Sequence, residues 1–317
     1  MSGGVVTLAV PCRTDEPALG RTLAAAWDAW QAAPGTTTSR LEVLVCLNGE
    51  APAGPALEQL WGFARPLGVT VREVDLDATP ARSELSPGPA PEVVALRTRR
   101  RGKAPAWNAL RHHAHGRTML FTDADVRFAP DAFGLLLGAL DEHPAAVLAS
   151  GKTVCDARPT LFEGVMAAPY GVDFPNLSPQ LYAARTDELP PRMPDNLLDP
   201  EHWLELTVGA ERIVRAPGAR VVIRLPATLR DFFRQRVRIE MAKVQLAAEH
   251  PHLLGRGAVQ PGPAAVLRAL RPADLLRLGA YLALRRAAHA VARRRYGSGR
   301  TADPWPQAGS TKHWDTT

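Results

Sequence analysis

Two aspartates, Asp123 and Asp125, stand two positions apart, directly after the short apolar run from Met119 to Phe121. Such a run is typical of a buried strand, and residues i and i+2 of a strand point to the same side. We therefore expect both carboxylates to face one pocket where the strand ends, which is where open α/β sheets bind their ligands. Carboxylate oxygens are ligands of Mg²⁺ and similar hard cations, often together with substrate phosphates.

A cation and an amide precede this acid pair along the chain. Gly102-Lys103 places an ammonium group on what we expect to be a flexible turn, and Asn108 follows near the start of a predicted helix. An isolated Asp-x-Asp or Gly-Lys is common in turns and indicates little by itself. Together, within one block of the size of a strand-helix-strand unit, these residues favour a nucleotide-diphosphate site with a metal ion.

Alternating strands and helices are expected to position these residues. The predicted strands are Val5 to Val10 (ended by Pro11), Leu41 to Leu47, Val69 to Val74, Val93 to Leu96, Met119 to Phe121, Ala145 to Val154 and Val221 to Ile223. The predicted helices are Pro17 to Trp30, Ala56 to Ala64, Ala104 to His115, Pro130 to Leu140, Thr228 to about His250, and Ala264 to Ala292 with a break at Pro272. This order predicts an α/β fold, a doubly wound and mostly parallel sheet flanked by helices, with a C-terminal helical extension.

Three segments lack a regular pattern. Asp77 to Glu92 is rich in Pro, Ser and Ala and is predicted to be a mobile loop. Cys155 to Pro194 contains several prolines and is predicted to form loops over the sheet, as one wall of the site. Gly297 to Thr317 is predicted to be a polar tail.

Composition limits the class of protein. The 317 residues, 46% of them hydrophobic, fit one large α/β domain with an appendage or two domains. The three cysteines, Cys12, Cys46 and Cys155, are far apart and lack zinc-type spacing, which indicates a reducing compartment. The chain shows no signal-peptide-like start and no apolar run of about 18 residues, so we expect a cytoplasmic protein without a transmembrane helix.

Positive charge is concentrated near the C-terminus. The net charge is +6, and arginine dominates between Arg268 and Arg300. Two interpretations remain open: peripheral contact with an anionic membrane through this Arg-rich helix, or a helix packed on the core with a solvated Arg face, which we favour. The basic residues are not interleaved with aromatic ones, which argues against nucleic acid as the partner.

Six short motifs resemble glycosyltransferase family 2, the inverting enzymes of the GT-A fold, over roughly Val5 to Glu240. In chain order they are Pro11 to Asp15, Asn48-Gly49, Gly102-Lys103 to Asn108, Asp123 with Asp125, Asp199-Pro200-Glu201, and Gln235 to Ile239. The chain departs from the family pattern at Thr14, Asp15, Pro200 and Ile239. Processive members of the family carry transmembrane helices after this region, so the resemblance favours a single-addition enzyme.

The resemblance implies roles for individual residues. It implies nucleotide-sugar binding by Pro11, Arg13, Asp15, Asn48, Lys103, Asn108, Asp123 and Arg238, and it implies Mn²⁺ or Mg²⁺ on Asp125, backed by Asp123. The general base would be Glu201 or Asp199; we favour Glu201 because the apolar residues after it align best that way. The implied reaction is metal-dependent transfer, with inversion, of a sugar from a nucleotide-diphosphate sugar to a hydroxyl of an unknown small or lipid-linked acceptor.

The same resemblance divides the chain. Residues 1–225 would form the GT-A catalytic domain, with a nucleotide-sugar half (1–125) and an acceptor half (126–225). Residues 226–296 would form the helical extension and 297–317 the tail. Two other functions stay open: a catalytically impaired nucleotide-sugar-binding protein of the same fold, suggested by Pro200 and Ile239, and a basic nucleic-acid-binding protein.

Overall fold

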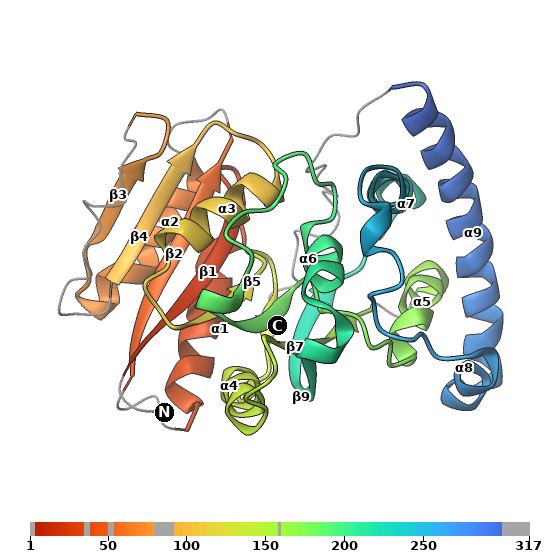
Figure 1. The fold of residues 1–317 in the computed structure, drawn as a ribbon, viewed down its shortest axis with the longest axis horizontal. Helices are drawn as coiled ribbons and strands as arrows, with labels where there is room; N and C mark the ends of the chain where they lie inside the picture. Colours follow the sequence, from red (N-terminus) through yellow and green to blue (C-terminus); the bar gives the residue numbers. More distant parts are fainter. Residues whose placement is uncertain (1–3, 35–38, 50–53, 79–91, 158–159, 300–317) are drawn as a thin grey trace.

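The computed structural model describes residues 4–34, 39–49, 54–78, 92–157 and 160–299 (Figure 1). The strands are β1 (Val5–Arg13), β2 (Arg40–Asn48), β3 (Val71–Asp75), β4 (Glu92–Thr98), β5 (Thr118–Thr122), β6 (Arg127–Phe128), β7 (Leu148–Asp156), β8 (Leu181–Arg185) and β9 (Ile213–Arg224). The α-helices are α1 (Leu19–Ala32), α2 (Pro55–Ala64), α3 (Lys103–His113), α4 (Ala132–Glu142), α5 (Leu161–Ala167), α6 (Pro200–Val208), α7 (Leu229–Glu249), α8 (Pro263–Ala269) and α9 (Pro272–Gly297).

All described strands belong to one sheet with the order β3-β4-β2-β1-β5-β8-β7-β9-β6. The first five strands in that order are parallel to one another, and β7 is parallel to β9. The strand β8 lies antiparallel between β5 and β7, and β6 is antiparallel to β9. The predicted mostly parallel sheet is confirmed, and the carboxyl ends of β1, β2, β4 and β5 meet at one edge.

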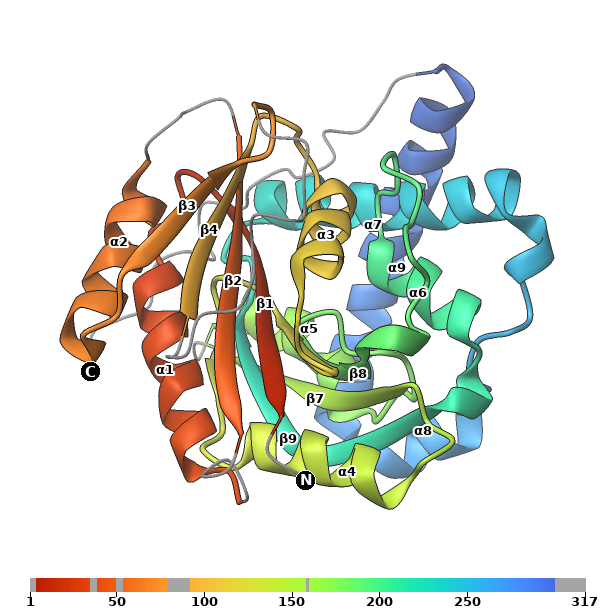
Figure 2. The ribbon, with the colours of Figure 1, turned by 60° about the vertical axis from the view of Figure 1, so that its left-hand side comes forward.

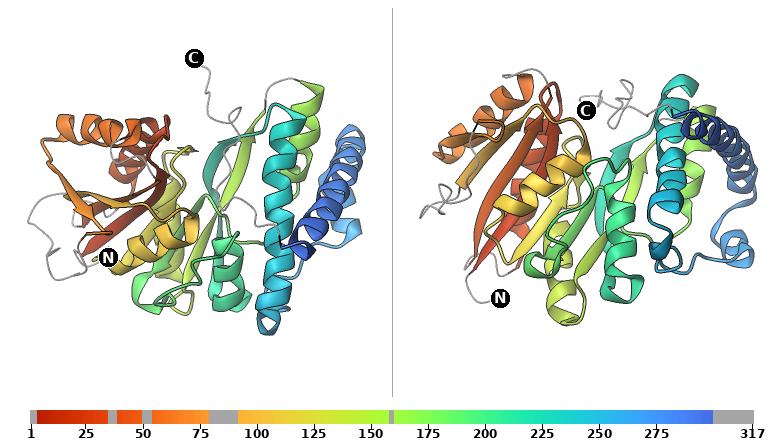
Figure 3. Two further views of the ribbon diagram at one scale, coloured as in Figure 1. Left: turned by 90° about the horizontal axis from the view of Figure 1, so that it is seen from above. Right: turned by 45° about the horizontal axis from the view of Figure 1, so that its top comes forward.

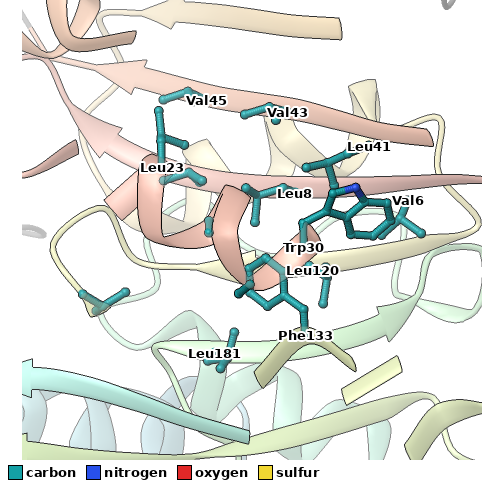
Figure 4. Close-up of a cluster of buried hydrophobic side chains, with 14 of the residues drawn as sticks. Val6, Leu8, Leu23, Trp30, Leu41, Val43, Val45, Leu120, Phe133 and Leu181 are labelled. Atoms are coloured by element: carbon teal, nitrogen blue, oxygen red, sulfur yellow. The ribbon is translucent and has the colours of Figure 1, made fainter. Parts of the chain in front are cut away.

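Helices cover both faces of the sheet (Figure 2). On one face α1, α2 and α4 pack on side chains of β1 and β2, and Figure 4 shows Trp30, Leu23 and Phe133 directed at that core. On the other face α3 and α6 pack on alternate residues of the same strands, around the fully buried Trp107. Because both faces are covered, the central strands are apolar on both sides, as is usual for parallel sheets.

The C-terminal helices form an additional layer beside the sheet (Figures 1 and 3). The helix α9 packs on α7, on α5 and on the short 3₁₀ turn η4 (Ala168–Gly171). The predicted break at Pro272 is confirmed, since α8 ends at Ala269 and Pro272 begins α9. No described helix is long and apolar enough to cross a membrane.

Several expectations need correction. The segment from Cys155 to Pro194 is not only loops, because it contains α5 and the central strand β8. The strand β8 has only five residues and lies between prolines, so it gave no periodic signal. Because β8 is buried on both faces, polar and apolar residues do not alternate along it. The strand β1 continues past Pro11 to Arg13; its pairing with β5 ends at Ala9, so the missing N–H of proline is tolerated there. Residues 79–91 and 300–317, which include most of the predicted mobile loop and the tail, lie outside the described residues.

A single buried carboxylate joins α7 to α9. Glu240 Oε1 accepts hydrogen bonds from Arg236 Nη2 (2.6 Å), Arg285 Nε (3.0 Å) and Lys243 Nζ (3.3 Å), and His289 Nδ1 lies 3.2 Å from Oε2. The pair of Arg236 and Glu240, expected from their helical spacing, is confirmed. Burial alone would raise the pKa of Glu240, but the surrounding cations, Lys243 and Arg236 foremost, lower it to about 2.

We expect Glu240→Gln to lower the free energy of unfolding by about 1–3 kcal/mol at pH 7, because the half-exposed partners weaken the usual cost of breaking a buried ion pair. The folded-state pKa lies below the ordinary value of 4.5, so the stabilisation is present above that value and is lost as pH falls towards 2. Urea unfolding at pH 7 and pH 3 measures it, with the exposed Glu142→Gln as control. A difference between variant and wild type that does not shrink at pH 3 contradicts this assignment.

Candidate active site

The carboxyl ends of three parallel strands form the first wall of the site. Arg13 at the end of β1 pairs in register with Asn48 at the end of β2, which pairs with Thr98 at the end of β4. The Arg13 guanidinium binds the Asp15 carboxylate, with Nε 2.8 Å from Oδ1 and Nη2 2.9 Å from Oδ2. Two residues expected to bind the nucleotide sugar are therefore paired with each other here, at the edge where such folds bind ligands.

Asn48 connects this edge to the start of α3. Its side chain is buried, and its Nδ2 donates to Gly102 O at 2.6 Å. Its Oδ1 is buried without a hydrogen-bond partner in the described part of the chain. An unpaired buried acceptor is costly, so Asn48 Oδ1 is suited to accept from a ligand N–H.

Lys103 enters the site from the first turn of α3. Gly102, with φ 120° and ψ 155°, caps this helix in a conformation that residues with a side chain rarely adopt. The expected flexible turn is wrong: Lys103 is the first helical residue and its side chain is only 12% exposed. Its position is fixed because it is part of a helix and because its ammonium group is paired on several sides.

The Lys103 ammonium group lies between two carboxylates from distant parts of the chain. Its Nζ is 2.6 Å from Asp123 Oδ1 and 2.9 Å from Glu201 Oε1, and it donates to Pro179 O at 3.0 Å. Burial lowers the pKa of Lys103, but Asp123 and Glu201 outweigh it and hold that pKa above its ordinary value. The cation of the donor-side motif, the first acid of the pair and the favoured base thus form one cluster.

Aromatic side chains lie beneath this cluster. Lys103 Nζ is 5.3 Å from the centre of the Phe121 ring, which stacks on Tyr182, and Tyr182 OH accepts from Trp107 Nε1 at 2.9 Å. Glu201 is almost fully buried beside them. Burial raises the pKa of Glu201 to about 7, with Lys103 opposing that rise. A carboxylate with a pKa near neutrality is suited to general-base catalysis.

The two aspartates lie just beyond β5, in a turn. We had expected strand alternation to set the directions of these two side chains. That expectation is wrong, because β5 ends at Thr122. The turn is instead fixed by α1: Thr22 Oγ1 donates to Ala124 O and Val126 O, at 2.9 and 3.0 Å. Asp123 is bound to Lys103, and Asp125 is partly buried on the same turn.

The acid pair fits a cation that arrives with a nucleotide. Within residues 4–34, 39–49, 54–78, 92–157 and 160–299, no group of three or more His, Cys, Asp or Glu side chains is arranged to hold a metal ion. A divalent cation held by one or two carboxylates and by substrate phosphates does not need such a group. Asp123 and Asp125 meet that lesser requirement.

The candidate bases have different roles in α6. Asp199 caps the helix, its Oδ1 accepting from His202 N at 3.2 Å, and Pro200 is the first helical residue. Glu201 therefore lies in the first turn and points into the Lys103 cluster. The proline between the two acids, a departure from the family pattern, is at a normal helix-starting position. The geometry favours Glu201 over Asp199 as the group that meets an acceptor hydroxyl.

Two other expected binding residues hold the segment before α6. Arg238 Nη1, on α7, donates to Leu198 O, so it lies beside the start of α6 and its contact here is not with the acid pair. Asn108 exchanges hydrogen bonds with the backbone of Met193 at 2.9 Å and donates to Asp195 Oδ1 at 2.8 Å. Both side chains position the loop that leads into α6, the helix that carries Glu201.

Sequence reasoning missed two residues that shape the site. Thr22 fixes the turn of the acid pair, and Asp77 accepts from Thr98 Oγ1 (3.0 Å) and Arg99 N (2.7 Å) at the end of β4. A single threonine inside a helix carries no sequence signal. Asp77 stands three residues after the predicted strand Val69 to Val74, and this position near a strand end was the one available hint.

The model of glycosyl transferase family 2 matches residues 84–192. The chain is similar to a solved mannosyltransferase from Pyrobaculum calidifontis in complex with GDP-Man and Mn²⁺, with 20% identity, a TM-score of 0.54, and coverage of 94% of this chain and 80% of that one. A search of curated proteins found no match.

Two further solved structures are more distant. Glucosyl-3-phosphoglycerate synthase from Mycobacterium tuberculosis, in complex with Mn²⁺, UDP-glucose and phosphoglyceric acid, is 15% identical over 78% of this chain and 79% of that one, with a TM-score of 0.47. TarS from S. aureus, in complex with UDP-GlcNAc, is 13% identical over 95% and 93%, with a TM-score of 0.46. At such identities the comparisons establish only the fold, and this conclusion rests on the similarity to the mannosyltransferase.

Proposed function

We propose that this chain is a glycosyltransferase of family 2 with a GT-A fold and that it catalyses a specific reaction. The family match over residues 84–192 and the fold similarity to the mannosyltransferase support the first part. The reaction is metal-dependent transfer of one sugar from a nucleotide-diphosphate sugar to an acceptor hydroxyl, with inversion at the anomeric carbon. The observation that carries the proposal is the cluster of Lys103, Asp123 and Glu201, which joins the donor-side acids to a base with a pKa near 7. We assign the donor half to residues 1–125 and the acceptor half to 126–225.

The donor is held, in this proposal, along the carboxyl edge of the sheet. Asn48 Oδ1 accepts from the base or ribose, and Pro11, Arg13 and Asp15 border the same position. A divalent cation, when bound to Asp125 and Asp123, neutralises the charge that builds on the departing diphosphate. Lys103 supplies further positive charge beside Asp123.

Glu201 acts on the acceptor. An acceptor hydroxyl has a pKa far above 7 and needs a base within hydrogen-bond reach. Glu201 takes that proton as the hydroxyl oxygen bonds to the anomeric carbon on the face opposite the diphosphate. Arg238 and Asn108 serve this step by holding the loop before α6.

The acceptor is a hydroxyl compound, either small or lipid-linked. We retain a cytoplasmic location as a prediction. The Arg-rich helix α9 packs on α7 and α5, as in the interpretation that we favoured, and we propose that its solvated Arg face also contacts an anionic membrane. A catalytically impaired sugar-nucleotide-binding protein is the second candidate, since Ile239 stands where the family motif has tryptophan. That protein would bind the donor and fail to hydrolyse or transfer it.

A thermal-shift screen tests the proposal and identifies the donor. We expect one of UDP-, GDP- or TDP-sugars with Mn²⁺ to raise the melting temperature by several degrees, since a ligand at 100 times its Kd adds about 2.7 kcal/mol. The same sugar nucleotide should be hydrolysed slowly in the absence of acceptor. Binding without hydrolysis, with any acceptor class offered, selects the impaired protein; no stabilisation by any of them contradicts both candidates.

A further inference from the structure

A groove of about 640 Å³ lies between α5 and the junction of α8 with α9, apart from the site described above. On the side of α5 and η4 it is lined by the small residues Gly164, Ala167, Ala168 and Gly171 together with Leu161, and its opposite side includes Leu270, Asp274 and Arg277. The volume is within the range of small-ligand sites, about 300–1,000 Å³. The groove is therefore large enough for part of a small molecule and is mostly apolar at its base.

Glycines keep the two sides of the groove close without filling it. A Cβ atom at Gly171 would lie 2.8 Å from Leu270 Cδ2, and one at Gly164 would lie 3.3 Å from Arg277 Nε. Larger residues at these positions would meet Leu270 and Arg277, and those two side chains would have to shift. The groove is thus a product of small residues at the contact between these helices.

Exposed leucines stand on the same helices that border the groove. Leu161 at the start of α5 is 80% exposed, Leu276 on α9 is 80% exposed, and Leu267 on α8 is 58% exposed. Single exposed apolar residues are ordinary, but several beside one apolar groove indicate an interaction surface. We call Leu161, Leu267 and Leu276 together with the groove the α5–α9 surface.

The charge of this region limits what binds there. Residues 263–297 hold one acid, Asp274, and eight arginines: Arg268, Arg271, Arg277, Arg285, Arg286, Arg293, Arg294 and Arg295. Asp274 is itself paired with Arg277 at 2.9 Å. This surplus exceeds the +6 of the whole chain. Exposed leucines beside clustered arginines complement an anionic membrane, which has an apolar interior and negatively charged head groups.

The position of these helices suits such a partner. α8 and α9 lie at the outer side of the molecule, away from β3 at the other end of the sheet (Figures 1 and 3). The face of α9 turned from α7 and α5 is exposed and includes Leu276, Ala280, Ala283 and Ala287. Since no described helix is long and apolar enough to span a bilayer, contact would be made by helices lying along it.

We propose that the α5–α9 surface binds anionic phospholipid, with one hydrocarbon chain in the groove and Leu161, Leu267 and Leu276 among the acyl chains. The exposed arginines would contact the head groups: Arg268, Arg271, Arg286, Arg293, Arg294 and Arg295. This refines the membrane contact proposed above and rests on it, but it does not depend on the transfer reaction. A lipid-linked acceptor would be presented to the enzyme at such a membrane.

Vesicle flotation of the full chain tests the surface. We expect flotation with phosphatidylcholine vesicles that contain phosphatidylglycerol and little with phosphatidylcholine alone. The double variant Leu161→Glu/Leu276→Glu should reduce the bound fraction by about tenfold or more. The matched control, Trp61→Glu/Leu135→Glu, adds the same charge at exposed residues of α2 and α4 and should float as wild type. Equal flotation of both double variants, or none by wild type, overturns the proposal.

Two further arms separate the groove from simple charge attraction. Lysophosphatidylglycerol below its micelle concentration should raise the melting temperature, whereas glycerol 3-phosphate should not, and Ala167→Trp should remove the shift. A shift with glycerol 3-phosphate alone overturns the chain-binding role. A dimer that Leu161→Glu/Leu276→Glu dissociates, without vesicle binding, assigns the surface to a second copy instead. Donor-induced stabilisation, measured on each variant, shows separately whether the proposed transferase function stands.

Discussion

Glu201→Gln is expected to lower kcat by about 10²–10⁴-fold, the usual contribution of a positioned general base. The amide keeps the size of the side chain and its place in the first turn of α6, but it cannot take the acceptor proton. The affinity for the sugar nucleotide should change little, because no expected donor contact involves Glu201. Steady-state kinetics with the donor found in the screen, and donor titration by calorimetry, measure the two quantities.

Asp199→Asn is the matched control for this variant. Asp199 caps α6 through His202 N, and asparagine is an equally good cap, so kcat should stay within a few-fold of wild type. If Asp199→Asn removes activity and Glu201→Gln does not, the base is Asp199. If neither does, the cluster around Lys103 is not the catalytic centre.

The pH dependence of the reaction gives an independent check on Glu201. Burial raises its pKa to about 7, so the base form is lost below neutrality. The value of kcat/KM should rise with pH up to about 7 and then level off, and the remaining activity of Glu201→Gln should lack this limb.

The raised pKa of Glu201 has the opposite effect on the stability of the fold. A carboxyl group whose folded-state pKa is raised becomes a cost to the folded state as pH rises from 4.5 to 7.

The second large effect is expected at the acid pair. Asp123→Asn and Asp125→Asn should each lower kcat by about 10³-fold or more, because stabilising the charge on a leaving diphosphate is worth several kcal/mol. Both variants should also need more Mn²⁺ for half-maximal activity. The exposed Asp141→Asn on α4 serves as control.

The two acids are expected to differ in one respect. Asp123 also binds Lys103, so Asp123→Asn leaves that ammonium group with the Glu201 carboxylate and the Pro179 carbonyl, and it should alter the acid limb of the pH profile. Asp125→Asn should leave that limb in place. Wild-type turnover in either variant would show that the pair does not hold a required cation.

Much of the fold could be predicted because local patterns and tertiary packing agree. The strands β1, β2, β4 and β5 are apolar runs between turn residues, and burial on both faces is what such runs indicate. The capped start of α7 at Thr228 and the break before α9 at Pro272 also follow from local chemistry. The strand β8 could not be found, because its place between β5 and β7 is set by partners far away in the chain.

The site was predictable in its residue types and not in its pairings. Spacing and resemblance singled out Lys103, Asp123 and Glu201 separately. Their meeting requires that the end of β5 and the starts of α3 and α6 lie at the same place, which is a property of the folded sheet. Asn108 and Arg238 were expected beside the donor, but their contacts in the structure are with the loop before α6. Whether either also binds the donor stays a prediction.

The sequence by itself determined an α/β protein, since strand length and helix caps are local properties, and its motif order resembles that of a nucleotide-sugar enzyme family. Only the tertiary structure decided that one lysine neutralises both a donor-side acid and the favoured base. A pairing energy depends on distance and burial, and neither is defined until the carboxyl ends of the strands and the start of α6 are brought together.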